Sequence, residues 1–413
     1  MVKLRSATLL IAAALALAAL PGCIGVWGRA PVTPADAPAA YDSRQAYNRR
    51  VYDVAWDAVR RHYYDAAMHG VDWNAARDRH RPRAEAAADE AALYEAINAL
   101  LGELEDEHTY AASPDEVEED RRHQGVLVGL ISSPYGEQDT HRLVLDVLPG
   151  SSAAASGVQP GWVLVRVEGR PPGEVLGPGR LQDGQQVRCE FLDNTDTPRL
   201  LTLTAKPVSV DPIRTVRVLD GGAVLMRFDR FDLDTARWVR AQLKAHKKAP
   251  AMIVDLRQNP GGEALALARA LGEFFPHSIP MGRFVRRSGD DEPLRASPGL
   301  VGARYPGAVA VLVSENSGSS SEIFAHAIQQ QKRGIVLGAK TSGAVLGAET
   351  GSLPGGGELQ VSVRDYLTAD GKRLEGAGVT PDIAVETTID DLRAGRDPVV
   401  AAALERLATT PAR

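Results

Sequence analysis

One short stretch near residue 320 constrains the fold of this chain more than any other. Residues Val311 to Gln331 read VLVSENSGSSSEIFAHAIQQQ: an apolar strand, a tight turn of Gly and Ser, and a segment whose apolar residues recur at helical spacing. A strand that leads directly into a helix places the turn at the helix N-terminus, beside backbone N–H groups that have no partner within the helix. A serine in this turn is therefore a candidate nucleophile beside a site that stabilises an anion.

The same turn also has an ordinary structural interpretation. Ser319 and Glu322 have the spacing of a capping box, in which the serine and the glutamate bind each other's backbone N–H groups. Both interpretations of Ser319 remain open at this point. They are also compatible, because the N–H groups that a cap satisfies are those that an oxyanion needs.

The composition is that of an ordinary globular protein. The chain has 413 residues, 44% hydrophobic and 24% charged, with a net charge of −6, which allows two or three domains. No basic stripe with interleaved aromatic residues is present, so we expect no nucleic-acid partner. The densest basic run, Arg77 to Arg83, is typical of a solvated helix face.

Residues 1–22 are typical of an export signal. Lys3 and Arg5 precede an apolar run that is too short to span a bilayer comfortably, and Pro21-Gly22-Cys23 follows. The ending on Cys resembles the bacterial lipobox, which implies lipidation of Cys23, a membrane anchor and a place in the cell envelope facing the periplasm. Only Cys189 remains besides Cys23, so a lipidated chain has no pair for a disulfide. Plain secretion with cleavage nearby is the alternative.

Three further regions follow a tether rich in Pro and Ala at residues 23–40. Residues 41–112 show apolar stripes at helical spacing, which predicts a small helical bundle with Asp72 as an N-cap. Its last apolar turn ends at Leu104, so His108 is expected on a loop at the helix exit. Residues 212–395 alternate strand and helix patterns, which predicts a partly parallel sheet flanked by helices, and residues 396–413 hold a closing helix and the tail.

Between the bundle and this α/β region, residues 123–208 alternate with period two, as β-strands do, and Val126, Val128 and Leu130 are expected on one face of one strand. The stretch PGSSAAASGVQPGWVLVRVEG resembles the PDZ signature. The resemblance implies capture of peptide C-termini by strand addition, with backbone N–H groups holding the terminal carboxylate. The implied carboxylate loop is Gly125, Val126, Leu127, Val128 and Gly129. A PDZ domain that binds nothing is the alternative.

Two turns rich in glycine follow strands of the α/β region, Asn259-Pro260-Gly261-Gly262 and Ser317-Gly318-Ser319. Such turns let backbone N–H groups point into the crevice at the carboxyl edge of a sheet. N–H groups near Gly261 and at Ser320 are candidates for an oxyanion hole beside Ser319 Oγ. A purely structural role for both turns stays open, and no phosphate-binding motif accompanies them.

Four segments, VDLRQNPGG, SENSGSSSE, GAKTSGA and LEGAGVTPDI, resemble the C-terminal processing and tail-specific peptidases of family S41. The resemblance implies a multidomain α+β protein with an N-terminal helical bundle, a PDZ β-domain and an α/β peptidase core of the ClpP/crotonase type. It implies Ser319 as nucleophile and Gly261 as its oxyanion partner. Many members use a lysine base, but this chain has Ala344 in the lysine's place and Ala348 where a helper glutamine would fall.

A base is still required, because an unassisted serine hydroxyl is a poor nucleophile. The tricorn-like branch takes a histidine from an L-x-x-x-H-x-Y segment, which is similar to Leu104 to Tyr110 and implies His108 as base. The orienting acid of that branch implies Glu375, and Glu107, which stands where the branch has serine, is the alternative orienter. The residue after the nucleophile is Ser320, so a preference for basic substrates is not implied.

A purely structural interpretation of His108 is also open: a histidine at a helix C-terminus is favoured by the helix dipole. No metal-ligand spacing is present, and we expect no cofactor. We therefore expect a lipid-anchored serine endopeptidase that acts on proteins or peptides outside the cytoplasm. The first alternative is an inactive pseudopeptidase that binds peptides or other proteins through its PDZ domain. An apolar-ligand binder, like the retinoid-carrying members of the superfamily, ranks last.

Overall fold

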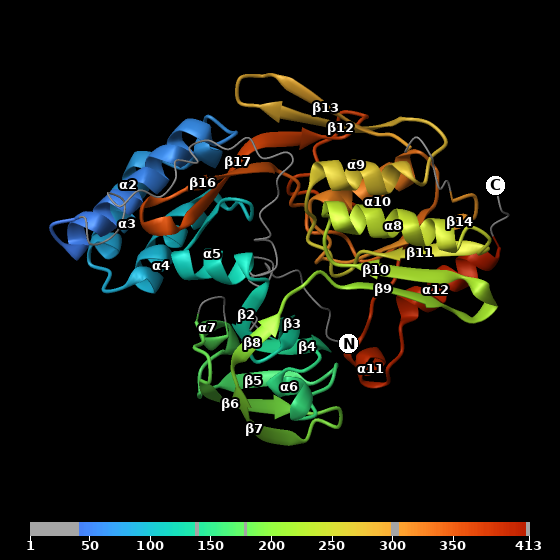
Figure 1. Ribbon diagram of the computed structural model, residues 1–413, viewed down its shortest axis with the longest axis horizontal. Helices are drawn as coiled ribbons and strands as arrows, with labels where there is room; N and C mark the ends of the chain where they lie inside the picture. Colours follow the sequence, from blue (N-terminus) through green and yellow to red (C-terminus); the bar gives the residue numbers. More distant parts are fainter. Residues whose placement is uncertain (1–40, 137–139, 177–179, 299–304, 410–413) are drawn as a thin grey trace.

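The computed structural model describes residues 41–136, 140–176, 180–298 and 305–409. The export signal, the lipidation at Cys23 and the tether lie outside these residues. The described chain combines a helical region, two sheets that share the central body, and a smaller separate sheet (Figure 1). None of the helices in the described ranges is long and apolar enough to cross a bilayer.

Three helices form the helical region at residues 41–104, and each begins at a side-chain cap. Ser43, Asp72 and Asp89 each accept a hydrogen bond from a backbone N–H of the first turn, so the predicted N-cap at Asp72 is confirmed. The helices are α2 (Arg44–His62), α3 (Trp73–Glu85) and α4 (Glu90–Leu101), with the short 3-10 turns η3 (Met68–Gly70) and η4 (Gly102–Leu104).

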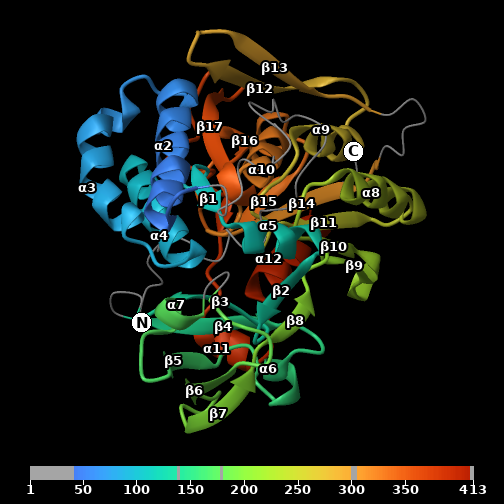
Figure 2. The ribbon, with the colours of Figure 1, turned by 60° about the vertical axis from the view of Figure 1, so that its left-hand side comes forward.

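The helical region packs against the first sheet rather than standing alone. Its core includes Leu359, Val361 and Val363 of strand β17, and Figure 2 shows α2 alongside this strand. The strand order is β1-β17-β12-β13, and β16 also pairs with β17. The bounds are β1 (Tyr110–Ala112), β12 (Ile279–Arg286), β13 (Asp291–Ala296), β16 (Gly347–Ser352) and β17 (Glu358–Leu367). The 3-10 turn η7 (Pro354–Gly356) joins β16 to β17.

The second sheet has six strands in the order β18-β15-β14-β11-β10-β9. All its pairs are parallel except that of β9 with β10, so the predicted, partly parallel sheet is confirmed. The strands are β9 (Arg214–Val218), β10 (Val224–Phe228), β11 (Ala251–Asp255), β14 (Ala308–Val313), β15 (Ile335–Gly338) and β18 (Ile383–Ala384), with η6 (Asp220–Gly222) between β9 and β10.

Helices cover both faces of this six-stranded sheet, as expected for parallel strands. One face packs on α8, α9 and α10, and the other on α12 (Figure 1). The helices are α8 (Leu233–Ala245), α9 (Ala264–Gly272), α10 (Ser320–Gln330) and α12 (Pro398–Ala408), and the short α11 (Ile389–Arg393) precedes α12.

The smaller sheet is antiparallel, with the order β3-β4-β5-β6-β7 and its own buried cluster. Helix α5 and the pair β2/β8 connect it to the rest. The bounds are α5 (Pro114–Arg121), β2 (Gln124–Leu127), β3 (Leu130–Tyr135), β4 (His141–Val147), α6 (Ser152–Ala155), β5 (Val163–Val167), α7 (Pro172–Val175), β6 (Gln186–Leu192), β7 (Pro198–Thr204) and β8 (Lys206–Ser209).

One strand prediction in this region is wrong. Val126, Val128 and Leu130 do not share a face of one strand, because β2 ends at Leu127 and β3 begins at Leu130. Gly129 has φ +92°, and a Cβ there would lie 2.0 Å from Ser151 Cβ. This close approach at a left-handed glycine turns the chain between the two strands.

The smaller sheet is attached to the six-stranded sheet by charged side chains. Arg393 of α11 donates to Gly161 O at 3.2 Å and pairs with Asp196. Arg227 of β10 lies 3.4 Å from the carboxylate of Asp146. A Cβ at Gly161 would lie 2.7 Å from Arg393 Cγ, so α11 sits directly on the turn before β5.

Candidate active site

The turn between β14 and α10 is held by the hydroxyl groups of its own serines. Ser317 Oγ donates to Leu256 O at 2.8 Å, and Ser321 Oγ donates to Asn259 O at 2.8 Å. Ser314 Oγ donates to Arg257 O at 2.6 Å. Three serines of this segment therefore bind the loop that leaves β11, which brings the two glycine-rich turns together as the sequence predicted.

Ser319 is the residue directly before α10, and its backbone is strained. Its φ of 48° and ψ of −115° are rare for a residue with a side chain. Its N–H donates to Ala344 O at 2.7 Å and lies 3.1 Å from Glu322 Oε2. Bonds on both sides of the turn hold this conformation, and Ser319 itself is half-buried.

Glu322 organises the turn from a fully buried position. Besides the Ser319 N–H, its carboxylate accepts from the N–H groups of Gly343 and Ala344 at 2.8 and 2.9 Å. It also accepts from Thr341 Oγ1 at 2.5 Å and from Ser342 Oγ at 3.2 Å. Burial raises the pKa of Glu322, and these hydrogen bonds oppose the rise. The predicted capping glutamate thus joins the serine turn to residues 341–344.

Gly261 faces Ser319 at the closest approach of the two turns. A Cβ at Gly261 would lie 2.6 Å from Ser319 Cβ and 3.1 Å from Ser320 N, and the glycine has φ +118°. Only glycine fits here. The Gly261 N–H, however, donates to Asn259 Oδ1 at 2.9 Å, so this predicted oxyanion donor already has a partner. Among the described residues, the Ser320 N–H has no acceptor, as expected for the first residue of a helix.

Residues 341–344 contain no proton acceptor in the place of the family's lysine. Ala344 is buried, and its backbone serves Glu322 and Ser319. Ala348 lies in β16. Neither methyl side chain can remove a proton from Ser319, so the base must come from elsewhere.

Glu375 is linked to the same segment. Its Oε2 accepts from Val345 N at 2.7 Å, and the next residue, Gly376, donates to Gly343 O at 2.7 Å. Burial raises the pKa of Glu375 to about 7, the bond from Val345 opposes this shift, and the charge of Asp106 adds to it. The carboxyl group therefore titrates near neutral pH within the loops around Ser319.

His108 lies on the loop between η4 and β1, at the helix exit where it was expected. Its side chain is half-buried, and its Nδ1 is buried with no partner among the described residues. Burial lowers the pKa of His108, and the charge of Asp106 partly offsets this shift. The imidazole is therefore neutral at pH 7, the form that accepts a proton.

The structure does not join all the predicted catalytic residues directly. Ser319, Ser320 and Gly261 form one contiguous group, and Glu375 reaches it through Val345. No hydrogen bond in the described part of the chain joins His108 to Ser319 or to Glu375. Glu107 is exposed and makes no hydrogen bond to the His108 ring within the described ranges.

Two residues beside His108 were missed from the sequence. Asp106 is buried and accepts from the His108 N–H and from Thr109 Oγ1, at 2.8 and 2.6 Å. Thr109 Oγ1 in turn accepts from Ser362 N of β17 at 3.0 Å. An aspartate that binds a backbone N–H two residues on is a known turn pattern, and this spacing was the available signal.

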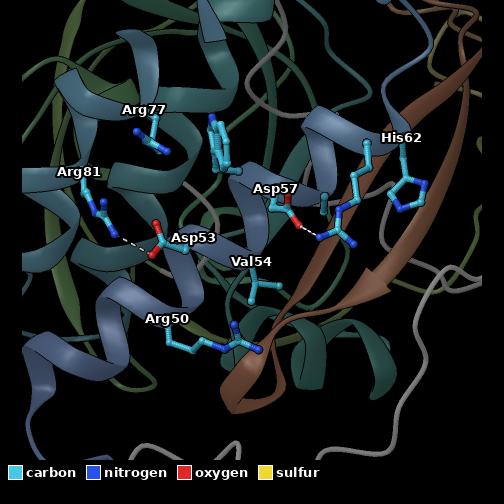
Figure 3. A pocket seen from close by; sticks show the side chains of 10 residues that line it. Arg50, Asp53, Val54, Asp57, His62, Arg77 and Arg81 are labelled. Atoms are coloured by element: carbon cyan, nitrogen blue, oxygen red, sulfur yellow. Dashed lines mark hydrogen bonds and ion pairs between the residues drawn. The ribbon is translucent and has the colours of Figure 1, made fainter. Parts of the chain in front are cut away.

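A cavity of about 550 Å³ lies elsewhere, along α2 and α3 (Figure 3). It is lined by Arg50, Asp53, Val54, Trp56, Asp57, Ala58, Arg61, His62, Arg77 and Arg81. None of these is a predicted catalytic residue, and Arg81 and Arg61 pair with Asp53 and Asp57 of the same wall. No cluster of three or more metal-ligating side chains occurs in the part of the chain that the structure describes.

Comparison with known families matches two parts of the chain. Residues 223–385 match peptidase family S41, and residues 45–102 match the tricorn protease C1 domain. The first range contains the serine turn, Gly261 and Glu375. The second contains helices α2, α3 and α4 and ends six residues before His108.

Curated relatives extend the match over most of the chain. A tricorn protease homolog of Streptomyces coelicolor is 29% identical over 401 residues, covering 88% of this chain and 33% of the relative. A CtpA-like serine protease of Staphylococcus aureus is 27% identical, covering 71% and 60%. The chloroplastic C-terminal processing peptidase of Tetradesmus obliquus is 26% identical, covering 81% and 76%. The chain thus spans a third of the first relative and less than two thirds of the second.

Solved structures show the same fold. The photosystem II D1 C-terminal processing protease superposes with a TM-score of 0.57 at 24% identity, covering 82% of this chain and 93% of that one. Mature CPAF superposes with a TM-score of 0.63 at 11% identity, covering 88% and 97%. The mixed helix-and-sheet architecture is therefore that of these proteases. Residues 223–385 are thus a peptidase S41 domain, and the relatives that match most of the chain are named as proteases.

Proposed function

We propose that this protein is a serine endopeptidase with Ser319 as its nucleophile. The observation that carries the proposal is the strained backbone of Ser319, directly before α10 and facing Gly261. A serine at a strained turn between a strand and a helix presents its hydroxyl next to the N–H groups of the helix N-terminus. The match of residues 223–385, which include Ser319, to peptidase family S41 supports the same assignment.

His108 is the proposed base. A neutral imidazole accepts the Ser319 proton at Nε2, and its pKa, lowered by burial, keeps it neutral at pH 7. The unpartnered Nδ1 then needs an acceptor that fixes the tautomer. We assign this role to Glu375, whose pKa near 7 leaves it partly ionised at neutral pH, and Glu107 remains the alternative.

The oxyanion that forms when Ser319 attacks the scissile carbonyl is assigned to two N–H groups. The Ser320 N–H has no acceptor within the described ranges. The Gly261 N–H has to be shared with Asn259 Oδ1, to which it donates in the present structure. The imidazolium of His108 then protonates the leaving amine, and water attacks the acyl-enzyme with His108 again as base.

The region 123–208 is proposed to be a PDZ domain that presents substrate C-termini. Its strand β3 is at the edge of the smaller sheet, where a peptide strand can be added. Within the implied carboxylate loop, Gly125 to Leu127 pair with β8. The carbonyl groups of Val128 and Gly129 accept from the N–H groups of Ala153 and Leu148, whereas their own N–H groups have no acceptor among the described residues. We therefore assign the terminal carboxylate to the N–H groups of Val128 and Gly129.

The proposed site of action is the bacterial cell envelope, outside the cytoplasm. It rests on the export pattern of residues 1–22 and the lipobox-like Cys23. Protein and peptide substrates are the expected partners, as the named activities of the relatives suggest.

A fluorophosphonate probe tests the nucleophile, because it forms a covalent bond only with an activated serine. The wild-type chain should label, and Ser319→Ala should abolish labelling. His108→Ala should lower the labelling rate by about 10²–10⁴-fold, the contribution of a general base. Ser288→Ala and His80→Ala, which change an exposed loop serine and a histidine paired with Glu103, are the matched controls. A wild type that never labels but still binds a peptide C-terminus would identify the pseudopeptidase instead.

A further inference from the structure

Asp106 closes the turn that carries His108. Only 8% of its surface is exposed, and its two carboxylate oxygens are used by two different donors. Oδ1 accepts the backbone N–H of His108 at 2.8 Å, and Oδ2 accepts Thr109 Oγ1 at 2.6 Å. Glu105, just before it, is left-handed at φ 50°, so the chain reverses sharply here. The carboxylate therefore fixes the backbone on which the imidazole is mounted.

The same turn is fastened to β17 on its other side. Thr109 Oγ1, which donates to Asp106, also accepts the N–H of Ser362 at 3.0 Å. Gln360 Nε2 donates to His108 O at 3.0 Å. Both polar backbone groups of His108 are thus bound, and only rotation of its side chain remains free. Removing Asp106 would release one of these two attachments and leave the Thr109 hydroxyl without its acceptor.

The charge of Asp106 also acts on both titratable groups of the proposed catalytic pair, His108 and Glu375. Burial lowers the pKa of His108 and raises that of Glu375, and the negative charge of Asp106 raises the pKa of both groups. Other groups face the cluster as well: Glu107 on the same turn, Tyr63 and Tyr64 at the end of α2, and Arg373, which is bound to Asp365 and Tyr64.

We propose that Asp106 is a positioning residue for the proposed peptidase reaction. It holds the His108 backbone in place and supplies a fixed negative charge beside the imidazolium that forms when Nε2 takes the proton of Ser319 Oγ. Asp106 transfers no proton in this proposal. The inference rests on the proposed function and adds a carboxylate besides Glu375 and Glu107, with a role distinct from orienting Nδ1.

Asp106→Asn tests the charge, because it keeps the size of the side chain and one acceptor oxygen. We expect the rate of fluorophosphonate labelling to fall about 10–100-fold, within the range for partial loss of general-base assistance. We also expect the pKa of His108, followed by NMR of its imidazole and assigned with His108→Ala, to fall because a neighbouring negative charge is lost. Asp106→Glu, which keeps the charge, should restore most of the pKa but not the full rate.

Asp72→Asn is the matched control. Asp72 is exposed, caps α3 and accepts the Ala75 N–H at 3.0 Å, so the change removes a carboxylate that binds a backbone N–H in the same helical region. It should leave the labelling rate and the pKa of His108 unchanged. Thr109→Val and Thr109→Ser form a second pair, since valine removes the hydroxyl that joins Asp106 to β17 and serine keeps it. Valine should slow labelling, and serine should not.

The outcomes separate this inference from the proposed function. A wild type that does not label at Ser319 overturns the proposed function and this role with it. A wild type that labels, together with an Asp106→Asn chain of unchanged labelling rate and unchanged His108 pKa, overturns the role of Asp106 alone. Lower stability with an unchanged His108 pKa would show that Asp106 is merely structural. If Asp106→Asn does not fold, equal rates in Thr109→Val and Thr109→Ser would contradict the inference.

Discussion

The serine turn and the histidine turn each carry one proposed catalytic side chain, but they are held in different ways. The serine turn is bound by Glu322 and by hydroxyl groups within the core of the six-stranded sheet, and its strain is held from both sides. The histidine turn is closed by one carboxylate and attached to β17 by residues more than 250 positions away in sequence. The first depends on its local motif, whereas the second depends on how the helical region meets the sheet.

Loss of Glu322 should have the largest effect, because the serine turn has one buried acceptor for five donors. Glu322→Gln should lower the free energy of unfolding by about 3 kcal/mol, since several buried N–H and O–H groups lose a charged acceptor. Labelling of Ser319 should be abolished. Denaturant unfolding and probe labelling check both effects. Glu315→Gln, on the exposed part of the same turn, is the control, and a Glu322→Gln chain as stable and reactive as this control would contradict the expectation.

Gly261→Ala should come next, since its new Cβ would lie 2.6 Å from Ser319 Cβ. Displacement of the nucleophile by a fraction of an ångström or more should slow labelling by about 10²-fold. Gly289→Ala is the matched control, because Gly289 also has positive φ, at +87°, but has open space around its Cβ. Equal losses of reactivity in the two variants would mean that backbone strain, and not contact with Ser319, is responsible.

The free energy of unfolding should depend on pH through Glu375, the proposed partner of His108. A carboxyl group whose pKa is raised from 4.5 to about 7 in the folded protein favours folding below pH 4.5, and this contribution is lost as pH rises to about 7. The free energy of unfolding should therefore fall less between pH 5 and pH 8 in Glu375→Gln than in the wild type. Glu405→Gln, on the exposed face of α12, should behave as the wild type. An identical pH dependence in all three chains would contradict the raised pKa.

The smallest effect is expected from Gln360→Ala, which removes one neutral hydrogen bond to His108 O. Stability should fall by about 1 kcal/mol, and the labelling rate should fall less than about tenfold. Gln329→Ala removes the bonds from its Nε2 to Thr380 O and to the Asp382 carboxylate, neither of which involves the histidine turn, and should leave the rate unchanged. A rate loss in the Gln329 variant as large as in the Gln360 variant would mean that general destabilisation explains both.

The contrast between the turns also explains what could be predicted from sequence. Ser319, Glu322 and Gly261 lie in short motifs next to strongly patterned strands, so their proximity followed from the sheet's carboxyl edge alone. The parallel sheet and the cap at Asp72 followed equally from local periodicity. The role of Glu322 as acceptor for residues 341–344 did not, because it depends on a loop that follows one helix and one strand later.

The other features that the sequence did not predict share a physical cause. In each, a side chain or a turn contacts a residue that the periodicity of the sequence does not identify. Asn259 takes the Gly261 N–H, which the sequence left free for an oxyanion. Val128 and Gly129 leave the strand because Gly129 passes close to Ser151. Asp106 looked like one more acidic residue in a polar loop, and only the fold shows that it is buried against Thr109.

The contact of Arg393 with the smaller sheet gives the molecule a route for thermodynamic linkage. Arg393 holds Gly161 O and Asp196, and the chain between Glu375 and Arg393 runs through β18 at the edge of the six-stranded sheet. A ligand that prefers the smaller sheet with this contact broken must spend binding energy on releasing α11. By reciprocity, the factor by which such a ligand weakens the α11 contact equals the factor by which loss of that contact strengthens binding of the ligand.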